Sequence, residues 1–382
     1  MRIVMLGTRG VPAAYGGFET AIEEIGRRLV ADGHEVTVYC RGSKDKPATH
    51  LGMRLVHLPA APKKALETLS HTALSVLHLL FSRRRYDAAF VFNAANAVFL
   101  PVLRLRRLPV AVHVDGLEWK RTKWGTWGRR YYRGAESLSV RWADALIADA
   151  QGIADYYTAE FGVATDLITY GAPIQDAPAH DKIGAEGLSV RGYHLVVARF
   201  EPENHVLEIV EGFRSSSARK PLVVVGSAPY ANDYTARIKS AAAGDKRIRL
   251  LGGVWDQDLL DQLYANAMTY LHGHSVGGTN PSLLRAMGAG TPVLAYDVSF
   301  NREALGQDGL YFSDAKDVAT ELIVAEDRGP ENLAHIGDRL RERARETYNW
   351  DEVASRYADL ATRLQSRTTQ RGSATGRRTQ PS

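Results

Sequence analysis

Cysteine is nearly absent from this chain, since Cys40 is the only one among 382 residues. One thiol excludes an internal disulfide and is typical of a reducing, cytoplasmic compartment. Long apolar runs are missing too: the longest, 73–81, is interrupted by His78 and is too short to span a bilayer, so we expect a buried helix. Met1 leads directly into a strand pattern, without the basic and apolar regions of a signal peptide. We therefore expect a cytoplasmic protein.

Extremes of composition are also absent. Hydrophobic residues make up 45% of the chain and charged residues 24%, the balance of a globular protein. At roughly 150 residues per domain, the length favours two or three domains. The net charge of +5 is concentrated in the first half. The basic segments there are Arg83–Arg85, Arg104, Arg106–Arg107 and Lys120–Arg133.

The last of these basic segments alternates with tryptophan and tyrosine, including Trp119, Trp127 and Tyr131. Such a mixture is typical of surfaces that lie at an anionic membrane interface. Nucleic acid would attract the same charges, but no helix-turn-helix, zinc-finger or RNA-binding motif accompanies them. We predict an anionic membrane surface as a partner, placing the protein peripherally at the inner face of the cell membrane, and no nucleic acid. A merely solvated face is the alternative.

Strand and helix patterns alternate along the chain in two series. Apolar strand-like runs occupy 2–7, 35–40, 54–58, 88–92, 110–113 and 145–148, then 193–198, 221–225, 248–251, 268–271, 292–295 and 309–312. Such alternation predicts parallel sheets with right-handed crossovers, an α/β fold of two doubly wound Rossmann-like domains. Between the series, a segment rich in Asp, Ala, Pro and Gly reads as a linker. We predict domains at 1–173 and 190–365, a linker at 174–189 and a disordered basic tail at 366–382.

Two glycine-rich loops each connect a strand to a helix. The first contains Gly16 and Gly17, and the second contains Gly277 and Gly278. Free N–H groups at a helix N-terminus bind phosphate, and glycine lets a ligand approach the backbone closely. Turn glycines without a ligand are the alternative. The position between strand and helix favours two nucleotide-binding-like halves facing a central cleft.

Four separated segments carry a family resemblance. They are Gly7–Thr20, Val114–Arg121, Arg199–Asn204 and His274–Ser282. In this order they resemble the glycosyltransferases of the GT-B fold, specifically the large retaining family 4, and within it a bacterial rhamnosyltransferase branch. The resemblance covers nearly the whole chain before the tail. It implies an enzyme that transfers a hexose from a nucleotide sugar without a metal or other cofactor.

The resemblance also implies roles for individual residues near the donor. Gly16 and Gly17 match a glycine pair near the donor phosphates, and His113 matches a histidine that contacts the donor sugar near the reacting centre. Arg199 matches an arginine that clamps the diphosphate, where a cation stabilises the departing group. The lysine expected five residues later is Asn204 here, which removes one positive charge.

In the second loop the family has two glutamates eight positions apart, where this chain has Gly277 and Arg285. Arg285 either reaches a phosphate or is merely exposed, and Glu303 is a replacement candidate for a ribose contact. The other expected donor contacts are Gly226, Gly253 and Val254 for base and ribose, and Gly277, Gly278, Thr279 and Asn280 for the diphosphate.

Carboxylates and histidines elsewhere allow further interpretations. Asp115 and Glu118 follow a strand, where they either bind acceptor hydroxyls, which we favour, or pair with neighbouring basic residues. His272 and His274 are spaced like metal ligands, but without a nearby carboxylate or cysteine a zinc site is improbable. The Asp256-Gln-Asp258 segment reads as a helix N-cap rather than a metal motif.

Taken together, the resemblance implies transfer of L-rhamnose from dTDP-L-rhamnose, with retention, to a hydroxyl of a lipid-linked saccharide in cell-surface polysaccharide synthesis. Domain closure would exclude water from the reaction. One alternative is a UDP-sugar-dependent glucosyl- or N-acetylglucosaminyltransferase. Another is a catalytically inactive nucleotide-sugar-binding protein, which the departures at Asn204 and Arg285 allow.

Overall fold

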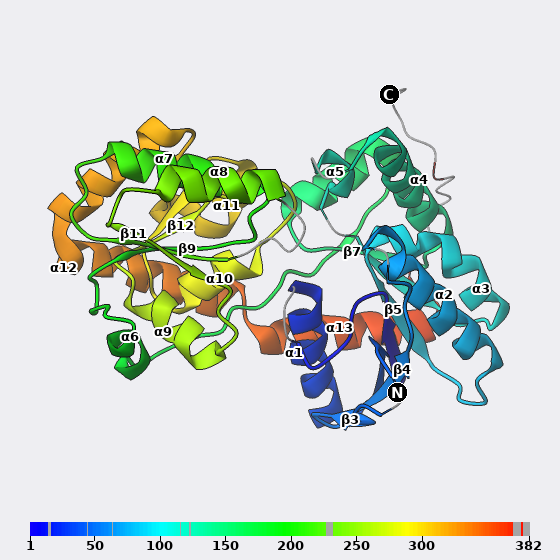
Figure 1. The fold of residues 1–382 in the computed structure, drawn as a ribbon. Helices are drawn as coiled ribbons and strands as arrows, with labels where there is room; N and C mark the ends of the chain where they lie inside the picture. The colour runs from blue at the N-terminus through cyan, green and yellow to red at the C-terminus, as the bar shows by residue number, and fades with distance from the viewer. Residues whose placement is uncertain are drawn as a thin grey trace. The chain divides into compact units, whose positions relative to one another are not determined.

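The computed structural model describes residues 1–13, 17–43, 45–62, 64–114, 116–121, 124–226, 232–369 and 376. The chain forms two compact units, one of Met1–Tyr170 with Trp350–Ser382 and the other of Gly171–Asn349. Each unit is a sheet covered by helices on its faces (Figure 1). The predicted doubly wound α/β architecture is therefore confirmed for both units.

The first unit is built on an eight-stranded sheet of order β3-β4-β2-β1-β5-β6-β7-β8, parallel except for the β3–β4 pair. Its strands are β1 (Arg2–Leu6), β2 (Glu35–Arg41), β3 (Thr49–His50), β4 (Met53–Leu58), β5 (Ala88–Phe92), β6 (Val110–Val114), β7 (Ala145–Ala148) and β8 (Asp166–Leu167). The helices are α1 (Gly17–Ala31), α2 (Lys64–Phe81), η1 (Ala94–Phe99), α3 (Leu100–Leu105), η2 (Glu118–Lys120), α4 (Thr126–Trp142), α5 (Gln151–Phe161) and α13 (Trp350–Gln365). Strand order reverses between β1 and β5, which defines a switch point.

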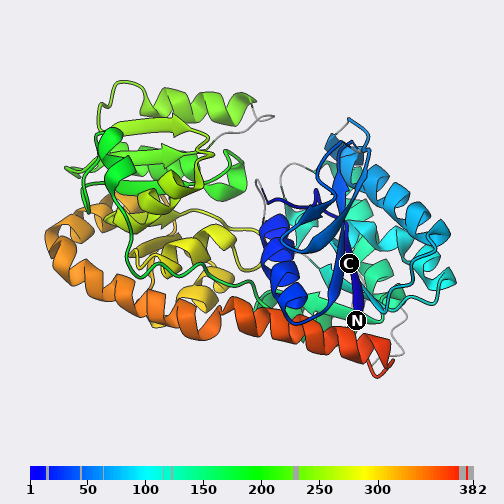
Figure 2. The ribbon, with the colours of Figure 1, turned by 90° about the horizontal axis from the view of Figure 1, so that it is seen from below.

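The second unit has a six-stranded parallel sheet of order β11-β10-β9-β12-β13-β14. Its strands are β9 (His194–Val197), β10 (Leu222–Val225), β11 (Ile248–Gly252), β12 (Thr269–His272), β13 (Val293–Tyr296) and β14 (Leu310–Phe312). The helices are α6 (Asp181–Ala185), η3 (Pro202–Asn204), α7 (Val206–Ser215), α8 (Asn232–Ala242), α9 (Gln257–Asn266), α10 (Pro281–Gly288), α11 (Ser299–Leu305), η4 (Gly306–Asp308) and α12 (Ala315–Thr347), which is kinked at Gly329 (Figure 2). Its switch point lies between β9 and β12.

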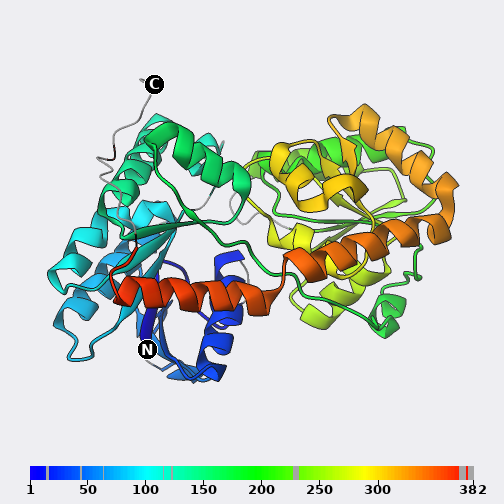
Figure 3. The same ribbon diagram turned by 180° about the vertical axis from the view of Figure 1, so that it is seen from behind.

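Two of the expected domain boundaries need correction. The segment expected as a linker, 174–189, belongs to the second unit, and within it α6 packs against α9. The helix α13, expected in the second domain, belongs to the first unit, where it packs against α1 and β5 (Figure 3). Its amphipathic pattern buries Val353, Tyr357 and Leu360. A pattern read along the chain shows that this helix has an apolar face but not which sheet receives it.

The run 73–81 also differs from expectation. It lies in α2, where Val76 and Leu79 are buried in the core while Leu74, Leu77 and Phe81 are exposed. The helix is apolar on both faces, so its sequence alone resembles that of a buried helix.

Glycine allows two backbones to meet at each switch point. A Cβ on Gly7, which follows β1 with φ +105°, would stand 2.3 Å from the carbonyl oxygen of Phe92 at the end of β5. A Cβ on Gly273, which follows β12, would stand 2.1 Å from the carbonyl oxygen of Asn204. Since real Cβ atoms do not approach so closely, both positions require glycine.

We expect Gly7→Ala to destabilise the first unit by on the order of 3 kcal/mol, because it adds a backbone clash to a left-handed φ. Gly33→Ala is a matched control, since Gly33 also has a positive φ of +82° but no atom within 4 Å of a Cβ. It should cost only about 1 kcal/mol. Urea denaturation measures both changes, and equal losses would contradict the steric argument.

Candidate active site

The switch point of the second unit places two loops side by side. In open α/β sheets, ligands bind beyond the carboxyl ends of the strands, where the order reverses. Here β9 continues into Ala198 and Arg199, and β12 continues into Gly273 and His274. The predicted diphosphate clamp and the second glycine-rich loop therefore start from neighbouring strands.

Arg199 is half-buried at the end of β9, and its guanidinium forms no hydrogen bond or ion pair with any residue that the structure describes. Its backbone carbonyl oxygen accepts hydrogen bonds from Asn204 Nδ2 at 2.8 Å and from Glu201 N at 2.8 Å. The backbone is thus fixed while the positive charge is available to an anion.

Asn204, at the position of the expected lysine, is buried and uses both ends of its amide within the protein. Nδ2 donates to the Arg199 carbonyl at 2.8 Å, and Oδ1 lies 2.8 Å from Nδ1 of His274. The side chain therefore joins the loop after β9 to the loop after β12. Its predicted contact with the donor stays a prediction, and the geometry indicates a positioning role.

The glycine-rich loop leads into α10. Asn280 caps this helix, since its Oδ1 accepts from Ser282 N at 2.9 Å, and Thr279 beside it is buried. Gly277 has φ +133°, and within the described part of the chain the N–H groups of Gly277 and Gly278 donate to no partner. Free amides next to a helix N-terminus are the elements of an anion site.

The residues expected around base and ribose lie at other strand ends. Gly226 ends β10, where its N–H donates to Gly252 and a Cβ would stand 1.9 Å from the Ala198 carbonyl oxygen. Gly253 is exposed and Val254 half-buried after β11. Gly226 thus lies against Ala198, the residue before Arg199, so Gly226 and Arg199 are close neighbours.

Two residues of the second unit contact helices rather than the glycine loop. The Glu303 carbonyl on α11 accepts from Arg343 Nη2 at 2.9 Å, so this residue lies against α12, and its ribose contact stays a prediction. The Arg285 guanidinium pairs with Asp261 at 2.7 Å and also bonds Gln257 on α9. Arg285 is therefore not merely exposed, and a phosphate contact for it stays a prediction.

His113 ends β6 in the first unit and is almost completely buried, with 1% of its surface exposed. Nδ1 lies 2.9 Å from the Tyr357 hydroxyl, and the ring contacts Phe18, Phe92 and Tyr170. Burial lowers the pKa of His113 to about 3, so the imidazole is neutral. Nε2 has no hydrogen-bond partner among the described residues. His113 is therefore neither a fully satisfied core histidine nor a cation.

Comparisons with known proteins agree with this architecture. Residues 16–173 match the family model of a glycosyl transferase 4-like domain, and residues 191–326 match that of glycosyl transferases group 1. Together these matches span most of both units. The chain belongs to the GT-B glycosyltransferases.

Solved structures of similar fold support the same assignment. Sucrose-phosphate synthase from Thermosynechococcus elongatus superimposes with a TM-score of 0.79 at 20% identity, covering 96% of this chain and 99% of that one. HepE from Anabaena in complex with UDP-glucose gives 0.76 at 17% identity, with 95% and 99% covered. The α,α-trehalose-phosphate synthase (UDP-forming) from Burkholderia xenovorans gives 0.74 at 10% identity, with 94% and 100% covered. At these identities the likeness establishes the fold.

A relative in sequence is the O-antigen chain mannosyltransferase B of Escherichia coli, 29% identical over 135 residues. The match covers 34% of this glycosyltransferase and 35% of the relative, so the chain spans about a third of the length of that protein. This partial match supports the glycosyltransferase family and does not establish which sugar this chain transfers.

The structure describes only some of the first-domain residues that were predicted to contact ligands in this glycosyltransferase. Gly16 and Asp115 lie outside the described residues, as does most of the expected tail. Gly17 is the first residue of α1. Glu118 is buried, with one oxygen 2.8 Å from Arg121 Nε and the other accepting from Trp124 at 3.2 Å. These contacts favour the pairing alternative for Glu118, and its acceptor role stays a prediction.

In the described ranges, no three His, Cys, Asp or Glu side chains come together in a group that could hold a metal ion. Asp256 caps α9, accepting from Asp258 N and Leu259 N, as its sequence position predicted. His272 Nδ1 bonds the Tyr270 hydroxyl at 3.2 Å, and burial lowers its pKa to about 3. Metal-independence remains an expectation.

Two residues that position these histidines were not predicted from the sequence. Tyr357 orients His113 although the two are 244 positions apart, and Asn301 donates to the His274 carbonyl at 2.9 Å. No periodicity or motif connects such pairs. The sequence therefore carried no signal for either residue.

Arg199→Ala should weaken binding of the nucleoside diphosphate by roughly ten- to a hundredfold, because a hydrogen-bonded charge pair is lost. Arg285→Ala is the control, since its guanidinium is committed to α9, and it should lower thermal stability without changing affinity. Isothermal titration calorimetry measures the affinities. Equal losses in both variants would show that Arg199 has no special access to the ligand.

Proposed function

We propose that this chain transfers L-rhamnose from dTDP-L-rhamnose, with retention, to a hydroxyl of a lipid-linked saccharide in cell-surface polysaccharide synthesis. The observation that carries donor binding is the switch point of the second unit. There the Arg199 guanidinium and the amides of Gly277 and Gly278, which have no partner among the described residues, follow neighbouring strands. The family membership supports sugar transfer, and the four-segment resemblance supports the choice of sugar.

The proposed chemistry depends on stabilising the leaving group. The C1–O bond to the nucleoside diphosphate breaks as the acceptor oxygen bonds C1 on the same face, and the departing phosphate oxygen takes the acceptor proton. Arg199 and the loop amides offset the negative charge that develops on the diphosphate. No carboxylate stands at positions 277 and 285, which agrees with a mechanism without a protein nucleophile.

His113 has a separate part in this proposal. Because its ring is neutral and Tyr357 holds its orientation, it offers the sugar a hydrogen bond rather than a charge. A fixed, uncharged partner positions a hydroxyl group at little reorganisation cost.

A UDP-sugar donor is the second candidate. HepE carries UDP-glucose in its structure and the trehalose-phosphate synthase is UDP-forming, so neighbours in fold use uridine nucleotides. Glucose or N-acetylglucosamine would then be the transferred sugar. The third possibility, an inactive nucleotide-sugar binder, rests on the missing lysine and glutamates at Asn204, Gly277 and Arg285.

Thermal shift and calorimetry with dTDP, UDP, GDP, ADP, dTDP-rhamnose and UDP-glucose distinguish these donors. We expect selective stabilisation by the dTDP compounds that persists in EDTA, since ligand binding to the native state raises Tm. Selective stabilisation by UDP compounds would replace the rhamnosyl proposal by the second candidate. Stabilisation by none would overturn donor binding altogether. Hydrolysis of the bound nucleotide sugar then separates an active enzyme from a binder.

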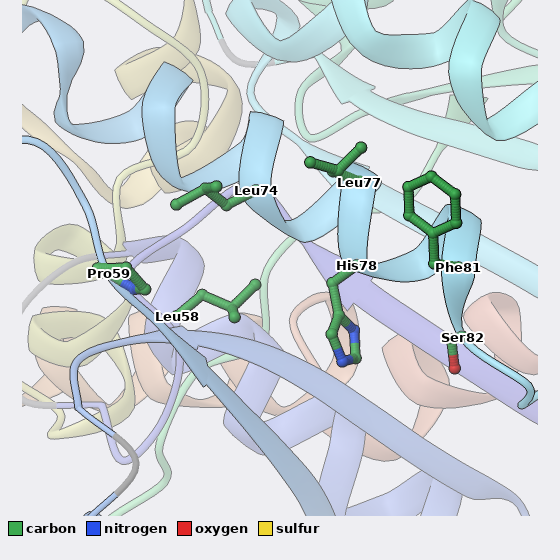
Figure 4. Close-up of a pocket in the computed structure, with 7 residues that line it drawn as sticks. All are labelled: Leu58, Pro59, Leu74, Leu77, His78, Phe81 and Ser82. Carbon is green, nitrogen blue, oxygen red and sulfur yellow. The ribbon is translucent and has the colours of Figure 1, made fainter.

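A lipid-linked acceptor would be met at a membrane surface, and α2 has an exposed apolar face that could contact it. Leu66, Leu77 and Phe81 are 50%, 50% and 77% exposed along one face of the helix. An apolar groove of about 420 Å³ lies between this face and the end of β4, as Figure 4 shows. Its lining consists of Leu58, Pro59, Leu74, Leu77, His78, Phe81 and Ser82. Exposed apolar patches of this kind mark interaction sites.

Basic residues follow the end of α2 in the chain. Arg83 and Arg85 come just after Ser82, which lines the groove, and within the described chain neither has an ion-pair partner. Arg106, after α3, donates to the Ser82 carbonyl at 2.6 Å and so holds the end of α3, with the exposed Leu105, beside the end of α2. Exposed apolar side chains followed by exposed arginines are complementary to anionic lipid. No helix in the described ranges is long and apolar enough to cross a bilayer.

Replacing both Leu77 and Phe81 by Ser should reduce binding to phosphatidylglycerol-containing vesicles roughly tenfold or more, because two apolar side chains no longer enter the lipid. Val190→Ser is the control, since Val190 is 51% exposed in the second unit. Vesicle sedimentation at low and high salt provides the measurement. Binding that is insensitive to both the double substitution and salt would show that this face is merely solvated.

A further inference from the structure

Tyr357 on α13 and His113 on β6 form a buried hydrogen bond within the first unit. Each residue is 1% exposed, and the Tyr357 hydroxyl lies 2.9 Å from His113 Nδ1. The rings packed around His113 are those of Phe18, Phe92 and Tyr170, and no carboxylate among the described residues bonds it. In these apolar surroundings burial lowers the pKa of His113, so the imidazole is neutral and carries a single proton.

The number of hydrogens at this contact decides which group donates. A phenol has one O–H, and a neutral imidazole has one N–H and one nitrogen that only accepts. The Tyr357 hydroxyl has no hydrogen-bond partner in the described chain besides His113. If Nδ1 donated, both the hydroxyl hydrogen and Nε2 would be buried without a partner. If the hydroxyl donates, only Nε2 is left unpaired, which is the less costly arrangement. The proton of His113 therefore lies on Nε2.

The N–H group at Nε2 has no acceptor within the described protein. Nε2 is buried, and it forms no hydrogen bond with any described residue. Such groups are almost always paired in native proteins, so an exception requires a partner from outside the chain. His113 lies near the carboxyl end of β6, at the edge of the sheet where ligands bind. Its ring is 5.1 Å from that of Phe18, which follows Gly17 of the first glycine-rich loop.

We propose that Tyr357 holds His113 in the tautomer whose proton is on Nε2, so that this N–H donates a hydrogen bond to an oxygen of the transferred sugar. Tyr357 is thus a positioning residue, supplied by a helix from the far end of the chain. The opposite tautomer would accept from a sugar hydroxyl but would not bind a ring or glycosidic oxygen. The sugar contact rests on the proposed function, whereas the tautomer is a property of the free protein.

NMR of the free protein with 15N-labelled histidine tests the tautomer. Protonated and unprotonated imidazole nitrogens differ widely in 15N chemical shift, and the His113 signals are identified by their loss in His113→Gln. We expect a protonated Nε2 and an unprotonated Nδ1 in the wild-type chain. In Tyr357→Phe, which removes only the hydroxyl, we expect both tautomers in exchange. A protonated Nδ1 in the wild type, or unchanged His113 signals in Tyr357→Phe, would overturn the proposal.

Binding measurements test the sugar contact. Calorimetry with dTDP-rhamnose and dTDP, and with UDP-glucose and UDP, gives the ratio of the two affinities, which isolates the contribution of the sugar. We expect Tyr357→Phe to reduce this ratio roughly three- to tenfold, because the hydrogen bond from Nε2 loses its direction. The affinity for dTDP or UDP alone should not change. His113→Gln, whose amide N–H stands near the place of Nε2, should retain more of the ratio than His113→Asn, whose amide stands near Nδ1.

Tyr39 provides a matched control in the same unit. It is also completely buried, and its hydroxyl lies 2.8 Å from Nδ1 of His78 on α2. Tyr39→Phe therefore removes the same kind of hydrogen bond from a histidine that has no part in the proposed sugar contact. We expect both tyrosine variants to lower Tm by similar amounts, but only Tyr357→Phe to change the ratio of affinities.

The outcomes separate this inference from the proposed function. A wild-type chain that binds no nucleotide sugar would overturn the proposed function and the sugar contact with it, while NMR would still decide the tautomer. Binding of a nucleotide sugar with the same ratio in the wild type and Tyr357→Phe would overturn only the role of Tyr357. An equal loss in Tyr39→Phe and Tyr357→Phe would also overturn that role, because it would show a general effect of lower stability.

Discussion

Close contact between two backbones at each switch point is the constraint on which both units depend. Gly7 after β1 meets the Phe92 carbonyl, and Gly273 after β12 meets the Asn204 carbonyl, with no space for a Cβ in either place. A larger residue would push apart the very strand ends from which the site loops start. Glycine at these two positions thus allows the loops that follow neighbouring strands to come close together.

Each unit places a buried histidine near its switch point, and each ring is oriented by an uncharged partner. In the first unit the Tyr357 hydroxyl holds His113, and in the second the Asn204 amide holds His274. Both rings are therefore fixed in direction by a hydrogen bond to a neutral group, and burial lowers the pKa of His113.

The sequence predicted those features that depend on local pattern. Alternating apolar runs identified the strands of both sheets except the two-residue strands β3 and β8, and glycines between strand and helix identified both loops. Features set by distant contacts were missed: α13 returns to the first unit, one face of α2 is exposed, and Asn204 bonds a residue 70 positions away. An apolar face indicates that a helix packs against another element. Which element it packs against depends on the topology of the chain, and hydrophobic periodicity carries no information about topology.

The return of α13 to the first unit has a consequence for biosynthesis. Domains generally fold as they leave the ribosome, N-terminal first. Here the first unit emerges without the helix that covers α1 and β5 and without Tyr357, and it receives both only after the entire second unit has been translated. Until then the apolar surfaces that α13 will cover are open and His113 lacks the hydroxyl that orients it. Completion of the first unit, including the contact between Tyr357 and His113, therefore depends on synthesis of the second unit.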